Sequence, residues 1–330
     1  MVKNSLFKVV STFAGCGGSS LGYKLAGGKV LLAVEWDDNA VETYRMNHYS
    51  TDIYHGDIAK LSVAEVLQRT SLKVGELDIF DGSPPCQGFS SAGKRELYDS
   101  RNQLFREYVR LLQGLKPKVF VMENVSGMVK GKMKLIFADI MRELKASEYQ
   151  VSARLMNSMY FGVPQSRQRM IFIGVRNDLD MRPSHPKPQV RPITFREACY
   201  DLRGNNPDDR MLGNMLLKMA KLQPDKWKSD INVYKHVKGN LASSISTHWI
   251  GWDRVCKTLV KSEISTSGLI HPDRERYISL AEAKRISSFP DDFKFVDRTS
   301  GIVRMGNCVP PKLMEAVARY IYNNILLKVQ

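Results

Sequence analysis

Short apolar runs alternate with helical patterns through the first half of the chain, and this alternation limits the fold more than any other feature. Helix-like spacing of apolar residues recurs at 18–27, 37–48 and 102–115. Strand-like runs are expected at 6–15, 30–36, 51–57, 77–82, 119–124, 149–157 and 169–176. This pattern predicts an α/β fold with a doubly wound, mostly parallel seven-stranded sheet, in which ligands bind beyond the carboxyl ends of the strands.

The pattern weakens after residue 180. Residues 181–192 contain four prolines in twelve positions, which predicts a linker. A turn followed by an amphipathic helix is expected at 306–327. We therefore expect a large α/β domain and a second, smaller domain.

The chain is basic. Its 330 residues include 49 Lys and Arg against 34 Asp and Glu, which gives a formal net charge of +15. This balance favours an anionic partner, most commonly nucleic acid, although a basic protein without such a partner is the alternative. The longest apolar runs, at 119–122 and 170–175, are too short to span a bilayer, and the N-terminus lacks a signal-peptide pattern. We expect a cytoplasmic protein that does not enter membranes.

Cysteine and histidine do not form a metal-binding pattern. The five cysteines are an odd number without close pairs, which argues against a disulfide framework. The sequence contains no Cys-x-x-Cys and no Cys/His cluster that would indicate a zinc site. The six histidines are scattered, so we expect them at the surface or in the core and predict no metal.

A glycine-rich turn and three later side chains together suggest a nucleoside-binding pocket. Gly15 and Gly17 stand between an expected strand and helix, where the backbone can approach a ligand closely. Glu35 and Trp36 end the second strand, where a carboxylate can hold ribose hydroxyls and an indole can stack on a base. Asp57 ends the third strand, where it could accept from an exocyclic amine. The alternative is that Glu35 and Asp57 are helix N-caps.

The spacing of the glycines narrows the choice of ligand. The turn has neither the Gly-x-x-x-x-Gly-Lys of a P-loop nor the Gly-x-Gly-x-x-Gly of a dinucleotide-binding turn. An adenosine ligand without phosphates, such as S-adenosylmethionine, fits this turn better than a P-loop nucleotide or a dinucleotide.

Cys86 is the strongest candidate for a reactive side chain. It stands in the turn after the fourth strand, between Pro-Pro and Gln-Gly, and not inside an apolar run. An exposed thiol in a polar turn is a candidate nucleophile. Glu123 and Asn124 end the next strand and are expected beside it. Arg167 and Arg169 are expected to activate the thiol or to hold an anion, and solvated surface charge is the alternative reading.

Six motifs, in this order, resemble those of the bacterial-type cytosine carbon-5 DNA methyltransferases. The motifs are FAGCGG, SPPCQGFSSAG, MENV, QSRQR, RERYISLAEAKRISSFPDDF and GNCVPP. The resemblance covers residue 7 to about 180 and about 268 to the end. It implies the S-adenosylmethionine-dependent methyltransferase fold, with a catalytic and cofactor-binding domain at 1–185 plus 303–330. A target-recognition domain would occupy 186–302, with a variable core at about 190–268.

The resemblance also implies a covalent mechanism. Cys86, as a thiolate, would add to carbon 6 of cytosine while Glu123 holds or protonates ring nitrogen 3 and the exocyclic amine. Carbon 5 would then take the methyl group of S-adenosylmethionine, leaving S-adenosylhomocysteine, before a base removes the carbon 5 proton and Cys86 departs. Arg167 would support the cytosine, and Arg169 would support the geometry of Cys86 and Glu123.

Base flipping is implied as well, because this chemistry cannot reach a cytosine inside a duplex. The loop 88–102 would open to admit DNA and close over the base, with Gln87 and Ser90 near the displaced strand. The basic recognition segment supplies candidates for DNA contact, although some of its tryptophans are expected in the core. These candidates are Lys226, Trp227, Lys228, Lys235, Lys238, Thr247, Trp249 and Trp252.

Cofactor contacts are carried over from the family motifs. The resemblance assigns them to Phe13, Glu35, Trp36, Asp57, Ile58, Pro85, Leu104, Asn307 and Cys308. Two positions depart from the family pattern: Cys308 stands where alanine is commoner, and Ser287 stands where glutamine is frequent. The C-terminal helix would return to pack beside the first motif.

The predicted function is methylation of a cytosine in a specific duplex DNA sequence by a monomer associated with the nucleoid. The natural biological role is protection of host DNA beside a separate cognate restriction endonuclease. The alternatives are a tRNA cytosine methyltransferase with the same core and a non-catalytic, DNA-binding relic of the fold. The Cys-Phe-Thr triplet that marks the tRNA branch is absent after residue 185, and a metal-dependent deaminase would need a ligand set that the chain lacks.

Overall fold

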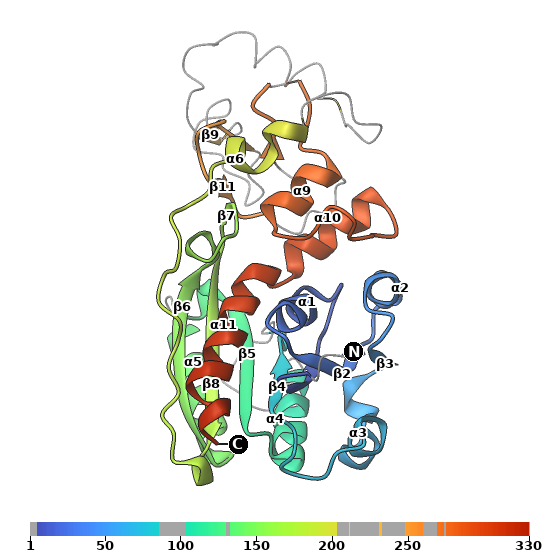
Figure 1. The fold of residues 1–330 in the computed structure, drawn as a ribbon, viewed down its shortest axis with the longest axis vertical. Helices are drawn as coiled ribbons and strands as arrows, with labels where there is room; N and C mark the ends of the chain where they lie inside the picture. Colours follow the sequence, from blue (N-terminus) through green and yellow to red (C-terminus); the bar gives the residue numbers. More distant parts are fainter. Residues whose placement is uncertain are drawn as a thin grey trace. The chain divides into compact units, whose positions relative to one another are not determined.

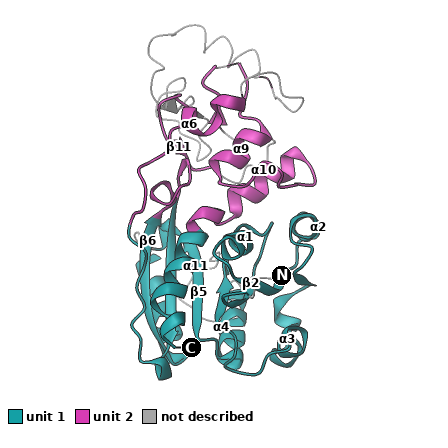
Figure 2. Cartoon of the chain, in the orientation of Figure 1, with its two compact units in different colours: residues 1–156, 168–187, 314–330 teal, residues 157–167, 188–313 magenta. Residues whose placement is uncertain are grey.

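The protein, described from a computed structural model, divides into two compact units (Figure 2). Unit 1 comprises residues 1–156, 168–187 and 314–330, and unit 2 comprises residues 157–167 and 188–313. The structure describes residues 5–85, 103–129, 133–202, 211, 231–232, 248–259, 269–273 and 275–329. Compared with the expected domains, 157–167 and 303–313 fall in unit 2. The recognition role of the smaller domain stays a prediction.

Unit 1 is built on a seven-stranded sheet with the order β3-β2-β1-β4-β5-β8-β6 (Figure 1). The strands are β1 (Lys8–Thr12), β2 (Lys29–Glu35), β3 (Asp52–His55), β4 (Ile79–Gly82), β5 (Val119–Val125), β6 (Tyr149–Asn157) and β8 (Gln168–Arg176). The pairs from β3 to β5 are parallel, and β8 runs antiparallel to β5. All seven predicted strands, and the mostly parallel sheet, are confirmed.

Helices cover both faces of this sheet, because successive side chains of a strand point to opposite faces. On one face, Val10, Leu32 and Phe80 join the main core with side chains of α3 (Val63–Thr70), α4 (Gln103–Leu115) and α5 (Met133–Ala146). On the other face, Ala33 packs with Tyr44 of α2 (Asp38–Asn47), and α1 (Gly18–Leu25) contributes Tyr23. The doubly wound arrangement follows from this alternation (Figure 1).

The two ends of the chain meet in unit 1. Helix α11 (Pro311–Asn324) places the ring of Tyr322 5.7 Å from that of Phe7, measured between ring centroids. Arg319 Nη2 donates to the carbonyl of Leu25, at the end of α1, over 2.7 Å. The predicted return of the C-terminal helix to the first motif is confirmed.

Unit 2 contains shorter elements. Its described helices are α6 (Phe195–Cys199), α9 (Leu280–Ile286) and α10 (Arg298–Asn307). Its strands are β7 (Gln165–Ser166), β9 (Ile231–Asn232), β10 (His248–Trp249), β11 (Cys256–Lys257) and β12 (Leu269–Ile270). They form one three-stranded sheet, β12-β10-β9, and one pair, β11-β7. The weak strand–helix alternation expected here corresponds to these two-residue strands.

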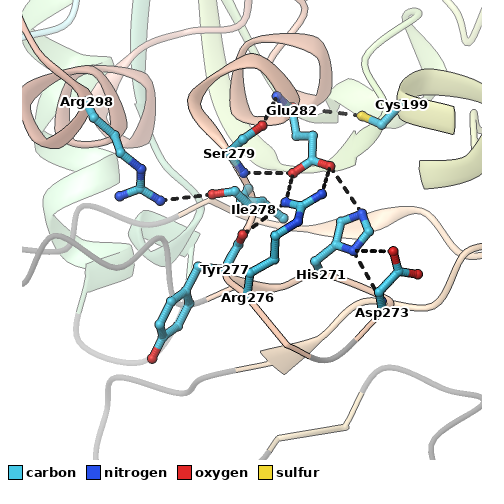
Figure 3. Close-up of polar contacts among 9 residues, drawn as sticks. All are labelled: Cys199, His271, Asp273, Arg276, Tyr277, Ile278, Ser279, Glu282 and Arg298. Atoms are coloured by element: carbon cyan, nitrogen blue, oxygen red, sulfur yellow. Dashed lines mark hydrogen bonds and ion pairs between the residues drawn. The ribbon is translucent and has the colours of Figure 1, made fainter. Parts of the chain in front are cut away.

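The buried carboxylate of Glu282 contacts Arg276, Ser279 and His271 within unit 2 (Figure 3). Glu282, fully buried on α9, accepts from Arg276 Nη1 at 2.8 Å and Nη2 at 2.9 Å, and from the backbone N–H of Ser279 at 2.7 Å. His271 Nε2 lies 3.1 Å from the same carboxylate. Burial alone would raise the pKa of Glu282, but the bonds from Arg276 and the neighbouring His271 lower it to about 2. The side chain is therefore a paired anion inside the unit.

Glu282→Gln is expected to destabilise the protein by about 3–5 kcal/mol, because it leaves the Arg276 charge buried without its carboxylate. The contribution of Glu282 is present above its unfolded pKa and is lost as the pH falls toward about 2. Denaturant unfolding between pH 7 and pH 3 should show this loss in the wild type and a flatter profile in the variant.

The matched control is Asp253→Asn, which breaks the exposed pair between Arg196 and Asp253 in the same unit. Exposed pairs contribute little, so no measurable change is expected. Equal stability losses in the two variants would contradict the larger contribution of the buried Glu282 pair to stability.

Candidate active site

The glycine turn at the carboxyl end of β1 requires glycine at one position for two reasons. Gly17 has a φ of 91°, which side chains rarely adopt, and it caps α1. A Cβ added there would lie 2.2 Å from Nε2 of His48 and 3.0 Å from the ring of Tyr44. Gly15 also has a positive φ, 53°, but the space around it is open. The positive φ and the close contacts of Gly17 thus restrict the backbone of the turn, and the open space around Gly15 leaves one side of the turn accessible.

Glu35 holds this turn directly. Its carboxylate accepts from the backbone N–H of Gly15 at 2.7 Å, of Trp36 at 2.9 Å and of Asp37 at 3.0 Å. The N-cap of α2 is Asp37, which accepts from Ala40 N, so the capping alternative is wrong for Glu35. Trp36 is 77% exposed, and its indole face is therefore available to a ligand.

Asp57 has a different local role. Its side chain accepts from the N–H of Ala59 at 2.9 Å and caps a short helix, Ile58–Lys60. The capping interpretation is therefore right for Asp57, and its contact with a base amine stays a prediction. Ile58 is buried in the main core, and Phe13 and Leu104 pack against that core.

Two side chains beneath the turn were not predicted from the sequence. His48, at the end of α2, is 2% exposed, and its Nδ1 lies 3.0 Å from Nζ of Lys24. Burial first, and Lys24 second, lower the pKa of His48 to about 3, so the ring is neutral at physiological pH. Asp81, on β4, is also buried. No local pattern identifies either residue, because their contacts depend on the tertiary fold.

The end of β5 carries a buried carboxylate paired with an arginine. Glu123 is 6% exposed, and its Oε1 lies 2.8 Å from Nε of Arg169 on β8. The antiparallel register places Arg169 opposite Val125, two residues from Glu123, so the two side chains meet on the diagonal. The alternative of solvated surface charge is wrong for Arg169, whose side chain is 12% exposed.

Asn124 links this strand end to the chain that precedes the predicted nucleophile. Its Nδ2 donates to the carbonyl of Pro84 at 3.1 Å, and its Oδ1 accepts from the N–H of Val125. Pro85, the last described residue before the gap, is exposed. The described residues do not include Cys86, Gln87, Ser90 or the predicted loop 88–102. They also do not include the candidate DNA contacts Lys226, Trp227, Lys228, Lys235, Lys238 and Thr247.

Arg167 is buried within unit 2. It is 1% exposed, and its guanidinium donates to the carbonyls of Leu259, Gly306 and Cys308 at 2.9, 2.7 and 2.9 Å. The surface-charge alternative is therefore wrong here as well. The hydrogen bonds join β7 to the end of α10, so Arg167 fixes the backbone around Asn307 and Cys308. A direct contact between Arg167 and cytosine stays a prediction.

The two departures from the family pattern are accommodated within unit 2. Ser287 is 2% exposed, and Gln165 Nε2 lies 3.4 Å from its Oγ. The buried side-chain amide of Gln165, in the QSRQR segment, therefore packs against Ser287. Cys308 is half-buried, and its Sγ contacts the carbonyl of Met305 at 3.2 Å. Asn307 is exposed at the end of α10.

The tryptophans that the structure describes in unit 2 are packed. Trp249 is 1% exposed, which places it in the core. Trp252 makes ring contacts with Phe195 and Tyr200, and the guanidinium of Arg196 lies 5.4 Å from its centroid. The expectation that some tryptophans are core residues is therefore confirmed.

The described residues contain neither a candidate metal site nor a helix that could span a membrane. No group of three or more His, Cys, Asp or Glu side chains in this part of the chain could hold a metal ion. None of its helices combines the length and the apolarity that crossing a membrane requires.

Comparison with known proteins identifies the family. The model of the C-5 cytosine-specific DNA methylases matches residues 7–323. The type II methyltransferase M.DdeI of Desulfomicrobium norvegicum is 31% identical over 95% of this chain and 88% of its own length. M.XorII of Xanthomonas oryzae pv. oryzae is 30% identical over 94% of this chain and 84% of its own.

Solved structures agree on the fold. A prophage-encoded E. coli protein assigned as a DNA modification methyltransferase superposes with a TM-score of 0.76 at 25% identity, covering 97% of this chain and 99% of that one. The methyltransferase EhMeth of Entamoeba histolytica has a TM-score of 0.68 at 16% identity, covering 96% and 98%. The chain belongs to the C-5 cytosine-specific DNA methylase family, and its class of activity is DNA cytosine methyl transfer.

Gly17→Ala is expected to lower the free energy of unfolding by about 2–5 kcal/mol, because it adds a left-handed non-glycine residue and a clash with His48. Gly162→Ala is the matched control: Gly162 has a φ of 78°, but nothing lies within 4 Å of its added Cβ. The control isolates backbone strain, about 1–2 kcal/mol. Urea unfolding of both variants checks this, and a Gly17→Ala loss no larger than the control's would contradict the steric argument.

Proposed function

We propose that this protein methylates carbon 5 of a flipped-out cytosine in duplex DNA through a covalent adduct of Cys86. One observation carries the proposal. The buried Glu123–Arg169 pair stands at the end of β5, while Asn124, the next residue, holds the carbonyl of Pro84, two residues before Cys86. Two neighbouring residues of β5 therefore have separate roles. Glu123 presents a carboxylate that Arg169 holds, and Asn124 holds the chain two residues before the thiol of Cys86.

The glycine turn fits the adenosine part of S-adenosylmethionine. Glu35 already accepts hydrogen bonds from three backbone N–H groups, two at Oε1 and one at Oε2, and Oε2 keeps an acceptor site for a ribose hydroxyl. The exposed indole of Trp36 suits stacking on adenine. Phe13, Gly15, Gly17, Asp57, Ile58, Pro85, Leu104, Asn307 and Cys308 are the further proposed contacts. When bound, this cofactor supplies a methyl group on a positively charged sulfur.

The chain's own residues would prepare the cytosine. Carbon 5 is a poor nucleophile until the Cys86 thiolate adds to carbon 6 and pushes electron density into the ring. Glu123 would hold or protonate ring nitrogen 3 and hold the exocyclic amine, and Arg169 keeps that carboxylate in place. After methyl transfer, a base removes the proton from carbon 5 and the bond between Cys86 and carbon 6 breaks.

The target cytosine must be flipped out of the DNA duplex to reach this site. Gln87 and Ser90 are proposed near the displaced strand, and the loop 88–102 is proposed to close over the base. Lys226, Lys228, Lys235, Lys238 and Thr247 are proposed DNA contacts of unit 2. The net charge of +15 supports a polyanionic partner.

The relatives named above are type II methyltransferases, and this favours a role in a restriction–modification system. We propose that the protein acts in the cytoplasm on nucleoid DNA, protecting host sites from a separate endonuclease. A monomer suffices, because one chain carries every motif.

The test is methyl transfer from radiolabelled S-adenosylmethionine to duplex DNA and to tRNA, with sequencing of methylcytosine in the product. Wild type is expected to label duplex DNA, and Cys86→Ala is expected to lose at least about 1,000-fold in rate, because the covalent route is removed. Cys199→Ala is the matched control, since it removes a thiol that is 1% exposed between α6 and α9.

The outcomes separate the candidate functions. Label on tRNA alone would overturn the DNA assignment. Label on DNA that survives Cys86→Ala would overturn the covalent mechanism. Binding of the cofactor without transfer to either nucleic acid would favour a non-catalytic DNA-binding protein.

A further inference from the structure

A second buried carboxylate lies beneath the glycine turn, and the chemistry above does not use it. Asp81 on β4 is 2% exposed. Its Oδ2 accepts from Ser11 Oγ at 2.8 Å, and its Oδ1 accepts from Tyr23 Oη at 3.1 Å. Both partners are fully buried. Burying a carboxylate in a core costs free energy unless hydrogen bonds or an opposite charge compensate it.

The two hydroxyl donors flank the turn that is proposed to hold the cofactor. Ser11 belongs to β1, two residues before Phe13, and Tyr23 lies on the second turn of α1, after Gly17. One side chain on a neighbouring strand therefore ties both ends of the turn together. The backbone is tied too, since Thr12 Oγ1 donates to the carbonyl of Asp81 at 3.0 Å.

Asp81 also leads into the segment that carries the predicted nucleophile. Gly82 follows it, and a Cβ there would lie 2.4 Å from Thr12 Oγ1 and 2.7 Å from the ring of Tyr108. Pro84 comes next but one and is held by Asn124. The chain at the end of β4 is therefore closely packed against the end of β1, where the glycine turn begins.

Asp78, the residue before the same strand, shows what an ordinary structural carboxylate looks like here. It accepts from the N–H of Lys8 at 2.8 Å and pairs with Nζ of Lys118 at 2.8 Å. The Asp81 carboxylate accepts instead from two neutral hydroxyls, those of Ser11 and Tyr23. A buried carboxyl between hydroxyls is less firmly held in its charged form than one beside a cation.

We propose that Asp81 is a positioning residue that sets the conformation of the glycine turn, so that affinity for the cofactor follows the charge on this carboxyl. The proposal rests on the proposed function, because it assigns the turn to S-adenosylmethionine and its product. It does not require Asp81 to touch the cofactor.

The charge on Asp81 changes near neutral pH. Burial raises the pKa of Asp81 to about 7, against the opposing effect of the bonds from Ser11 and Tyr23, and Glu123 adds a like charge. Among the described residues, the other titratable groups that interact with Asp81 are phenols. Burial raises the pKa of Tyr23, Tyr44 and Tyr108, so all three stay neutral across this range.

The direction of the effect follows from donors and acceptors. The ionised carboxyl accepts from Ser11 and Tyr23 together. The protonated carboxyl has a hydrogen of its own to donate, so one of the two hydroxyls must turn and the tie across the turn changes. Cofactor affinity is therefore high above pH 7 and falls as the pH falls.

The experiment is calorimetric titration of S-adenosylhomocysteine into wild type, Asp81→Asn and Asp78→Asn at pH 6, 7 and 8. Wild type is expected to bind about tenfold more weakly at pH 6 than at pH 8, which is the ratio for one group with a pKa of about 7 whose protonated form does not support binding. Asp81→Asn is expected to bind weakly at pH 8 and to lose this pH dependence. Asp78→Asn is expected to keep the wild-type affinity and profile, and ionisation of the ligand itself is common to all three proteins.

Ser11→Ala and Tyr23→Phe provide a second route if Asp81→Asn does not fold. Each removes one bond to the carboxyl, and each is expected to weaken binding at pH 8. Unchanged affinity and pH dependence in Asp81→Asn, or in both hydroxyl variants, would overturn the proposal. The same loss in Asp78→Asn would overturn it too, because the effect would then be general destabilisation. Failure of the proposed function looks different: wild type itself would not bind the ligand at any pH.

Discussion

The parallel pairing of β1 with both β2 and β4 is the constraint on which the rest of the site depends. Parallel neighbours end at the same edge of a sheet, so the glycine turn after β1, Glu35 at the end of β2 and the chain after β4 converge there. The parallel pairing of β5 with β4 brings Glu123 to the same edge. Residues far apart in sequence thus share one edge of the sheet.

Much of this arrangement could be predicted from the sequence, because strand runs, strand ends and motif order are local features. All seven strands were predictable in this way, and the return of the C-terminal helix was implied by the resemblance to the family. The helices of unit 2 were less apparent, although two of them begin with capping boxes that are legible as Thr-x-x-Glu at Thr194 and Ser-x-x-Glu at Ser279.

The remaining features depend on tertiary contacts that no spacing rule encodes. Arg167 and Arg169 are two residues apart and carry the same charge, yet one binds three backbone carbonyls of unit 2 and the other pairs with Glu123. Asp81 and His48 lie beneath the turn, where burial decides their protonation.

The proposed reaction depends on a bond between Cys86 and carbon 6 of cytosine in DNA. The most direct measurement uses duplex DNA in which every cytosine carries fluorine at carbon 5, incubated with the protein and S-adenosylmethionine. Fluorine cannot leave as a proton does, so the adduct should persist as a complex that survives denaturing electrophoresis. Peptide mass spectrometry should place the bond at Cys86, and Cys86→Ala should form no complex. A complex bonded through another residue, or no complex with active wild type, would contradict covalent catalysis by Cys86.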